Sequence, residues 1–250
     1  MIETAIQTIL PTALYKLLKL LPLRSWQFIT QADQRLADYG LTALHAHRAL
    51  YPTLSPAQAQ ECGDMLGPLR LSLDQDTGLP MSDAQIAGNL ATYILAGADT
   101  TPAALSFITW ELARRADVYA KLRGELEAAA REAGLAEGED WRFEQLKELP
   151  YLAAVVKEGL RRYPPTVMPM TRVVPREGLQ LSPAAGGEML EAGTYVCASP
   201  WNLQMDATVF PEPERFEPER WLSATEEERK RMEESWMPFG LGVRACQGKL

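Results

Sequence analysis

The sequence predicts a mainly α-helical fold with a small β part, and three observations support this. Apolar residues recur at helical spacing over long stretches up to about residue 163. Four short segments of β-forming residues, separated by glycine and proline, lie between residues 171 and 198. The chain has 250 residues, of which 46% are apolar and 23% charged, so it has enough apolar side chains for a substantial core.

Local start and stop signals place the individual helices. Ser55 and Pro56 supply a cap and a first helical position for a short helix. Ser82, with Gln85 three residues later, forms a capping box at the start of a long helix, and Gly134 closes another. The helical ranges predicted in this way are 26–50, 57–66, 83–115, 116–133, 143–149, 151–163 and 225–235.

The long helix, taken over 81–115, contains an unusual segment in its middle. Residues 96–102 read Ala-Gly-Ala-Asp-Thr-Thr-Pro, and a proline inside a helix costs about 3 kcal/mol. Either the helix breaks here or another interaction compensates for a distortion, and the residues alone leave both readings open.

The β part is predicted over 171–199, with strands at 171–174, 179–181, 188–190 and 194–198. No repeat of supersecondary length is present, so residues 1–250 are predicted to form one domain. Residues 236–250 form a glycine-rich loop.

The charge and the cysteine pattern exclude several classes of protein. A formal net charge of -8 and a pI near 5.0 do not suit binding to a phosphate backbone, so no nucleic-acid partner is expected. The three cysteines lie too far apart in sequence for a disulfide framework, and an odd number suits a reducing, intracellular compartment. The chain does not start with the basic segment of a signal peptide. Residues 6–23 are interrupted by prolines and lysines, so they do not predict a membrane span. They predict a helix packed on the protein's own core, with an amphipathic helix on a membrane surface as the alternative.

Cys246, in the loop Phe-Gly-Leu-Gly-Val-Arg-Ala-Cys-Gln-Gly over 239–248, is the residue that most indicates chemistry. A cysteine that a flexible loop delivers to a helix start is biased toward thiolate by the helix dipole and by unpaired backbone N–H groups. Cys246 could then serve as a metal ligand or as a nucleophile. The alternative is that it is a small buried apolar residue, as most free cysteines are. A dinucleotide loop would need a third glycine, and a zinc site would need a second Cys or His nearby. His45 and His47 are expected to be ordinary surface or core residues.

Four segments together resemble the cytochrome P450 family, in the order and with the separations of the family. Residues 239–248, Phe-x-x-Gly-x-Arg-x-Cys-x-Gly, resemble its heme-binding loop, and residues 96–101 resemble the oxygen-side segment of its long central helix. The segments 157–165, with a Glu-x-x-Arg motif, and 216–221, Phe-Glu-Pro-Glu-Arg-Trp, resemble two further family segments. The resemblance covers about residues 82–250, and the rest of the chain more loosely. It implies a P450-like fold that is incomplete at both ends.

This resemblance implies a heme-thiolate monooxygenase, which inserts one oxygen atom from O2 into an apolar organic substrate with NADPH-derived electrons from an external reductase. Cys246 would be the axial ligand of the heme iron, and Phe239 would pack beside the ligand loop. Arg244 and Arg172 would face heme propionates, although Arg172 has the alternative of a solvated arginine on an edge strand. The loop glycines that would let the backbone approach the sulfur and the porphyrin are Gly242 and Gly248.

The resemblance also assigns roles in the two helices. Gly97 would open the helix wall on the oxygen side, and Asp99 and Thr100 would deliver protons as the catalytic pair. The alternative for the pair is a helix boundary with one of them as N-cap. Glu158 and Arg161 lie on one helix face and can pair, usually as a solvated surface bridge. The resemblance instead implies a buried network with Arg220 that supports the heme-ligand loop.

Departures from the family pattern make the activity of this chain a separate question. From the resemblance we expect the front portion of the family, its closing β structure and any membrane anchor to be missing, and Gln204 stands where many members have histidine. The alternative function is a truncated, non-catalytic remnant with weak or no heme binding. The expected partners are a small apolar substrate and a reductase. Endoplasmic reticulum association belongs to full-length relatives and would need the absent anchor.

Overall fold

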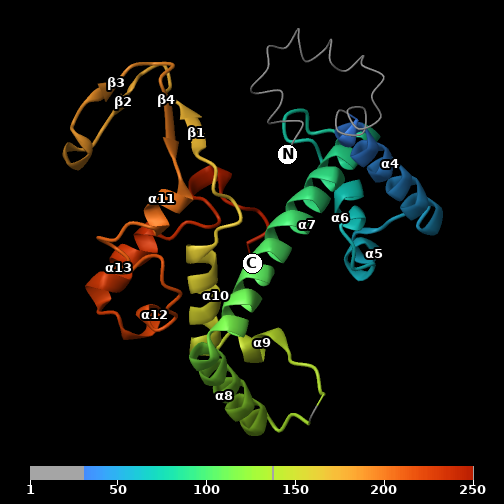
Figure 1. The fold of residues 1–250 in the computed structure, drawn as a ribbon. Coiled ribbons are helices and arrows are strands. Elements are labelled where there is room, and N and C mark those ends of the chain that lie inside the picture. The colour runs from blue at the N-terminus through green and yellow to red at the C-terminus, as the bar shows by residue number, and fades with distance from the viewer. Residues whose placement is uncertain (1–30, 137, 250) are drawn as a thin grey trace. The chain divides into compact units, whose positions relative to one another are not determined.

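The computed structural model describes residues 31–136 and 138–249 (Figure 1). The helix predicted over 6–23, and the first residues of the one predicted over 26–50, lie outside this range. The chain divides into two compact units, one ending at Ala98 and one beginning at Asp99. We describe each unit by itself.

The first unit consists of short helices around a small apolar core. Helix α4 (Ala32–Leu50) is followed by α5 (Pro56–Glu61) and α6 (Leu66–Leu71). Its core consists of Leu44, Leu66, Leu69, Ile86 and Leu90.

The predicted cap of the second helix is confirmed, but the predicted end of that helix is wrong. The Ser55 hydroxyl accepts a hydrogen bond from the Gln58 N–H, and the Gln58 side chain accepts one from the Ser55 N–H. The helix then stops at Glu61 because Gly63 takes a left-handed conformation with φ of 64°. Asp64 begins the separate helix α6, since its Oδ1 accepts hydrogen bonds from the N–H groups of Leu66 and Gly67 at 2.8 and 2.9 Å.

Helix α7 (Asp83–Arg114) runs without a break through Pro102, which answers the question that residues 96–102 left open. The predicted capping box is present: the Gln85 N–H donates to the Ser82 hydroxyl at 3.3 Å, and the Ser82 N–H donates to Gln85 Oε1 at 2.9 Å. The helix passes from the first unit into the second at Asp99.

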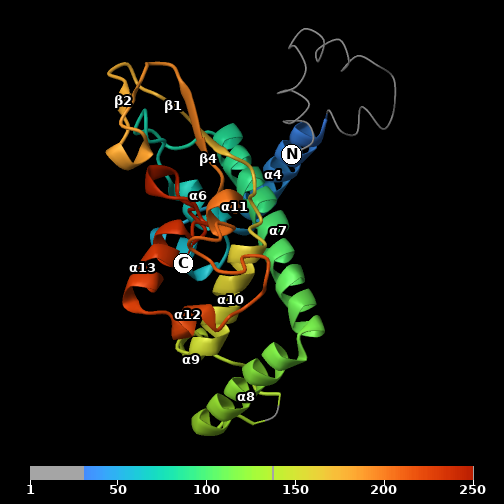
Figure 2. The same ribbon diagram turned by 60° about the vertical axis from the view of Figure 1, so that its left-hand side comes forward.

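In the second unit, the part of α7 from Asp99 onward is followed by α8 (Ala116–Ala133), α9 (Phe143–Leu146) and α10 (Pro150–Arg162). Gly134 ends α8 with φ of 67°, as predicted. Helix α10 lies beside this part of α7 (Figures 1 and 2). The approach is close, because a Cβ atom on Gly159 would lie 2.2 Å from Cγ1 of Ile108. The core between these helices contains Val118, Leu122, Tyr151, Val155 and Phe216.

The four predicted short strands are present, and they form two antiparallel pairs. Strand β1 (Met170–Val173) pairs with β4 (Tyr195–Ala198), and Arg172 lies opposite Val196. Strand β2 (Leu179–Gln180) pairs with β3 (Met189–Leu190). A 3-10 turn, η1 (Pro183–Ala185), connects β2 with β3.

The last part of the second unit is built from short helices. They are α11 (Pro200–Gln204), α12 (Arg220–Ser223), α13 (Glu226–Ser235) and the 3-10 turn η2 (Gly242–Arg244). The prediction that a helix starts at Cys246 is wrong for the residues that the structure describes, because a turn at 247–248 follows the cysteine. The prediction of a mainly helical fold with a small β part is confirmed. Within 31–136 and 138–249, no helix is long and apolar enough to cross a membrane.

Candidate active site

The loop that carries Cys246 is held by its own backbone. The Cys246 N–H donates to the Phe239 carbonyl at 2.7 Å, and the Ala245 N–H donates to the Gly242 carbonyl at 3.0 Å. Gly240 and Gly242 have φ of 67° and 68°, a conformation that favours glycine. Cys246 is exposed, which contradicts the alternative of a buried apolar cysteine.

Cys246 lines an apolar cavity of about 430 Å³ within the second unit. Its walls are α7 and α10, and its rim is formed by the segment after α10 and by the cysteine loop. The lining residues are Thr100, Thr101, Ala104, Leu105, Ile108, Val156, Leu160, Pro165, Thr166, Met170, Pro238, Phe239, Arg244 and Cys246. A volume of this size lies in the range of small-molecule and cofactor sites, which is roughly 300–1,000 Å³.

The cavity brings together four of the residues that the sequence analysis assigned to the site: Thr100, Phe239, Arg244 and Cys246. Gly242 and Gly248 belong to the same loop, and a Cβ on Gly248 would lie 3.8 Å from the Cys246 sulfur. Phe239 packs edge-on against Trp236, with ring centroids 6.2 Å apart.

Like Gly242 and Gly248, three residues outside the loop that were assigned to the heme site are not among those that line the cavity. Asp99 is exposed, and Gly97 precedes Thr100 by one helical turn, where a Cβ atom would meet nothing within 4 Å. Arg172 is exposed on β1, and its guanidinium donates to the Thr171 carbonyl at 2.9 Å. The alternative that Asp99 or Thr100 caps a helix is wrong, because both lie inside α7.

The residues of the cavity fit the heme that the sequence resemblance implies. A flat apolar macrocycle needs apolar walls, and α7 and α10 supply them with Ala104, Leu105, Ile108, Val156 and Leu160. Its iron accepts a soft thiolate ligand, which Cys246 can supply. Arg244 can pair with a carboxylate on the macrocycle's edge.

Glu158 of α10 forms the centre of a buried ionic network. Its carboxylate accepts two hydrogen bonds from Arg161, both at 2.9 Å, and one from Arg220 Nε at 3.1 Å. The Trp221 indole N–H donates to it at 3.0 Å and the Glu217 backbone N–H at 2.9 Å. The side chains of Glu158 and Arg161 are 0% exposed, so the interpretation of this pair as a solvated surface bridge is wrong.

Arg161 also ties distant segments to α10. Its Nη1 donates to the Gln204 carbonyl and its Nη2 to the Pro213 carbonyl, each at 2.8 Å. A guanidinium has five N–H donors in a fixed plane, which suits several acceptors at once. The network therefore connects α10 with α11, with the proline-rich segment before α12, and with α12 itself.

A second contact connects α10 directly to the start of the cysteine loop. The Trp236 indole N–H donates to the Lys157 carbonyl at 3.1 Å. The Lys157 ammonium lies 5.0 Å from the Trp221 ring centroid and 5.5 Å from that of Trp236. The sequence analysis missed both tryptophan roles. The only local signal was Trp221 as the last residue of the Phe-Glu-Pro-Glu-Arg-Trp segment.

The residue that follows α10, Tyr163, has a perturbed ionisation. Burial, together with a hydrogen bond that its hydroxyl donates to Glu111, raises the pKa of Tyr163 to about 12. Its ring stacks on Phe107 of α7 with centroids 4.7 Å apart. The contact fastens the end of α10 to α7 by one aromatic and one polar interaction.

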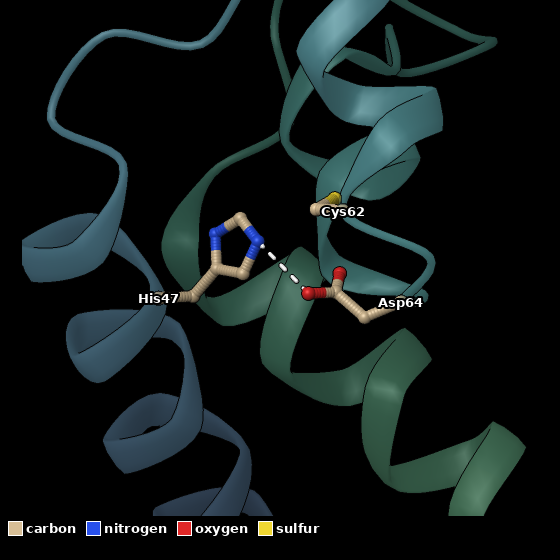
Figure 3. Close-up of side chains that lie close together, drawn as sticks. All are labelled: His47, Cys62 and Asp64. Carbon is tan, nitrogen blue, oxygen red and sulfur yellow. Dashed lines mark ion pairs between the residues drawn. The ribbon is translucent and has the colours of Figure 1, made fainter.

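The first unit contains another cluster of polar side chains, His47, Cys62 and Asp64, shown in Figure 3. Spacing along the sequence did not reveal it. His47 Nε2 is buried and lies 3.2 Å from Asp64 Oδ2, but the pair is not aligned as a hydrogen bond.

The donors around His47 do not suit a metal ion. Arg70 Nη1 lies 2.9 Å from His47 Nδ1. An arginine can only donate, so Nδ1 accepts and the ring proton lies on Nε2, the atom that faces Cys62 and Asp64. A metal would need the lone pair at that atom. We therefore interpret His47 as a buried structural histidine.

Comparisons with known proteins show what this chain is similar to. A family model described as Cytochrome P450 matches residues 2–250. A "Cytochrome P450 monooxygenase" of Aspergillus terreus is 38% identical over 165 residues, which are 66% of this chain and 32% of the relative. A "Cyclooctat-9-en-7-ol 5-monooxygenase" of Streptomyces melanosporofaciens is 33% identical over 186 residues, 74% of this chain and 38% of the relative. The chain thus spans about a third of the length of these relatives.

Solved structures show the same fold. A retinoic acid-bound cyanobacterial CYP120A1 matches with a TM-score of 0.71 and 24% identity, over 94% of this chain and 49% of that one. A cytochrome P450 described as CYP102L1 matches with a TM-score of 0.70 and 24% identity, over 90% of this chain and 48% of that one.

Proposed function

Since this chain belongs to the cytochrome P450 family, we propose that it carries the heme-thiolate site of a monooxygenase that inserts one oxygen atom from O2 into an apolar organic substrate. The observation that carries the proposal is the cavity in which an exposed cysteine and an arginine meet the apolar walls of α7 and α10. The electrons would come from NADPH through an external reductase.

Five residues of the cysteine loop would have a part in holding the cofactor. When bound, heme with a thiolate ligand supplies the O2 activation and O–O cleavage that a monooxygenase needs. Cys246 would be its iron ligand, and Arg244 would hold a propionate by a charge-assisted hydrogen bond. Phe239, held against Trp236, would shield the sulfur from water. Gly242 keeps the loop in its positive-φ conformation, and Gly248 leaves room beside the sulfur.

On the α7 side, Thr100 would hold water or move a proton at its hydroxyl, since it lines the cavity. Asp99 and Gly97, its neighbours in α7, would supply the proton and an open helix wall, as the family resemblance implies. Arg172 as a second propionate partner rests on the same resemblance. The lining supports an apolar substrate, because the cavity walls offer apolar carbon atoms and few polar groups.

The experiment is a heme titration of the purified chain, followed by the absorption spectrum of the reduced, CO-bound form. We expect the strongly red-shifted Soret band of thiolate-ligated heme, and we expect Cys246→Ala to lose it. The matched control is Cys197→Ala, because Cys197 is also exposed but lies on β4. Free-heme absorption that Cys246→Ala leaves unchanged would overturn the proposal and favour a non-catalytic remnant.

A further inference from the structure

We propose that Gln204 is a positioning residue for the cysteine loop: its side-chain amide fixes the start of the loop to the carboxyl end of α10. The inference rests on the proposed function, because the loop matters only if Cys246 binds iron. Gln204 is the last residue of α11, and it is 0% exposed.

The side-chain amide of Gln204 makes three hydrogen bonds, two to α10 and one to the cysteine loop. Its Nε2 donates to the carbonyls of Leu160 and Arg161, at 3.0 and 2.9 Å. Its Oε1 accepts from the backbone N–H of Met237 at 3.0 Å. The two carbonyls belong to the last turn of α10, where helix carbonyls have no partner within the helix. One side chain thus caps the helix and holds the loop.

The hold on Met237 reaches Cys246 through two further backbone bonds. The Gly240 N–H donates to the Met237 carbonyl at 3.1 Å, and the Cys246 N–H donates to the Phe239 carbonyl at 2.7 Å. The segment between Met237 and Gly240 is therefore hydrogen-bonded to the Gln204 side chain at Met237 and to the Cys246 N–H at Phe239.

The backbone of Gln204 is fixed by the Glu158 network. Arg161 Nη1 donates to the Gln204 carbonyl at 2.8 Å, and Glu158 holds the same guanidinium in two places. A glutamine fits this position because one amide group provides two donors and an acceptor. An apolar side chain would leave two helix carbonyls and one loop N–H unpaired in a buried place, and unpaired buried groups are costly.

The experiment measures hydrogen exchange at the Met237 amide by NMR, in the parent chain and in Gln204→Met. Methionine keeps the length of the side chain, but it replaces the amide oxygen that accepts from the Met237 N–H with a weakly accepting thioether, and it can donate no hydrogen bond. We expect a Met237 amide that is protected in the parent chain and that exchanges at least about tenfold faster in the variant. The control is Gln180→Met, since Gln180 Nε2 donates to the Gly187 carbonyl at 2.7 Å on the exposed β2–β3 hairpin. It should leave Met237 unchanged.

A second readout is the reduced, CO-bound spectrum of the heme-loaded chains. We expect Gln204→Met to convert part of the thiolate-type Soret band to the band of heme without thiolate, and Gln180→Met to keep the parent spectrum. An unprotected Met237 amide in the parent chain would overturn the proposal without any variant. The proposal would also be overturned if Gln204→Met folds and its Met237 amide exchanges at the same rate as in the parent chain.

The two proposals fail in different ways. If the parent chain shows no thiolate-type band, the proposed function fails, while the exchange at Met237 still decides whether Gln204 holds the loop. If the parent band is present and Gln204→Met changes neither readout, only the positioning role fails.

Discussion

The Glu158 network and the Cys246 loop lie in one unit of the chain, and they are built in opposite ways. The network is buried, and a single carboxylate there accepts hydrogen bonds from two arginines, an indole and a backbone N–H. The loop over 241–249 is exposed throughout and depends on a few backbone bonds. The difference teaches that the buried polar interactions of this unit hold α10, α11 and α12 together, while Cys246 stays exposed in its loop.

Removing the carboxylate at the centre of the network should have the largest effect. Glu158→Gln leaves Arg161 and Arg220 buried without the charge that they share, and breaking a buried ion pair in this way costs about 3–5 kcal/mol. The free energy of unfolding, from denaturant titration, measures the loss. The control is Glu233→Gln, because the ion pair of Glu233 with Lys157 is partly exposed, at 42% and 33% of the two side chains, and it should cost less than about 1 kcal/mol. Equal losses in the two variants would refute the contrast between network and surface.

The stability of the chain at high pH should report the contact between Tyr163, at the end of α10, and Glu111 of α7. The pKa of Tyr163 is about 12 in the folded chain and about 10 in an unfolded one. Between pH 10 and 12 the Tyr163 hydroxyl loses its proton in the unfolded chain before it does so in the folded one. The stabilisation that this hydroxyl gives the folded chain is therefore complete below pH 10 and is lost as the pH rises to 12. The free energy of unfolding should fall by up to about 1.4 kcal/mol per pH unit from this group, and less steeply in Tyr163→Phe. Identical slopes in both chains would rule this contact out.

A smaller effect is expected when the network loses one neutral donor. Trp221→Phe keeps an aromatic ring against Phe210 but removes the indole N–H that donates to Glu158 Oε2. Because the carboxylate keeps its other donors, we expect a loss of about 1 kcal/mol in the free energy of unfolding. A loss as large as that of Glu158→Gln would mean that packing, and not the hydrogen bond, dominates at this position.

The smallest effect should come from the loop. Val243 is 103% exposed, so Val243→Ser should change the free energy of unfolding by less than about 0.5 kcal/mol. A loss above 1 kcal/mol in the heme-free chain would show that the loop is packed in solution, and it would remove the difference between the two regions.

Local signals in the sequence were sufficient where a structure depends on neighbours in the chain. The capping box at Ser82 and the glycine at 134 set the start of α7 and the end of α8, and the spacing of Glu158 and Arg161 predicted a pair on one helix face. The burial of that pair came only from the family resemblance, because no local pattern reveals what covers a helix face.

The features that escaped prediction depend on contacts between distant residues. The sequence marks Gln204 only as a departure from the family pattern, because its partners Leu160, Arg161 and Met237 lie more than 30 positions away. Helix α6 begins where Asp64 caps it, and α12 is a single short turn whose Trp221 donates to Glu158. Such short elements are stabilised by tertiary contacts, which helical periodicity does not report.

The most direct test of the central claim is iron K-edge X-ray absorption of the chain loaded with heme, compared with the Cys246→Ala variant. Our account predicts one sulfur atom bound to iron in the parent chain and none in the variant. An iron environment of nitrogen and oxygen alone in the parent chain would contradict it.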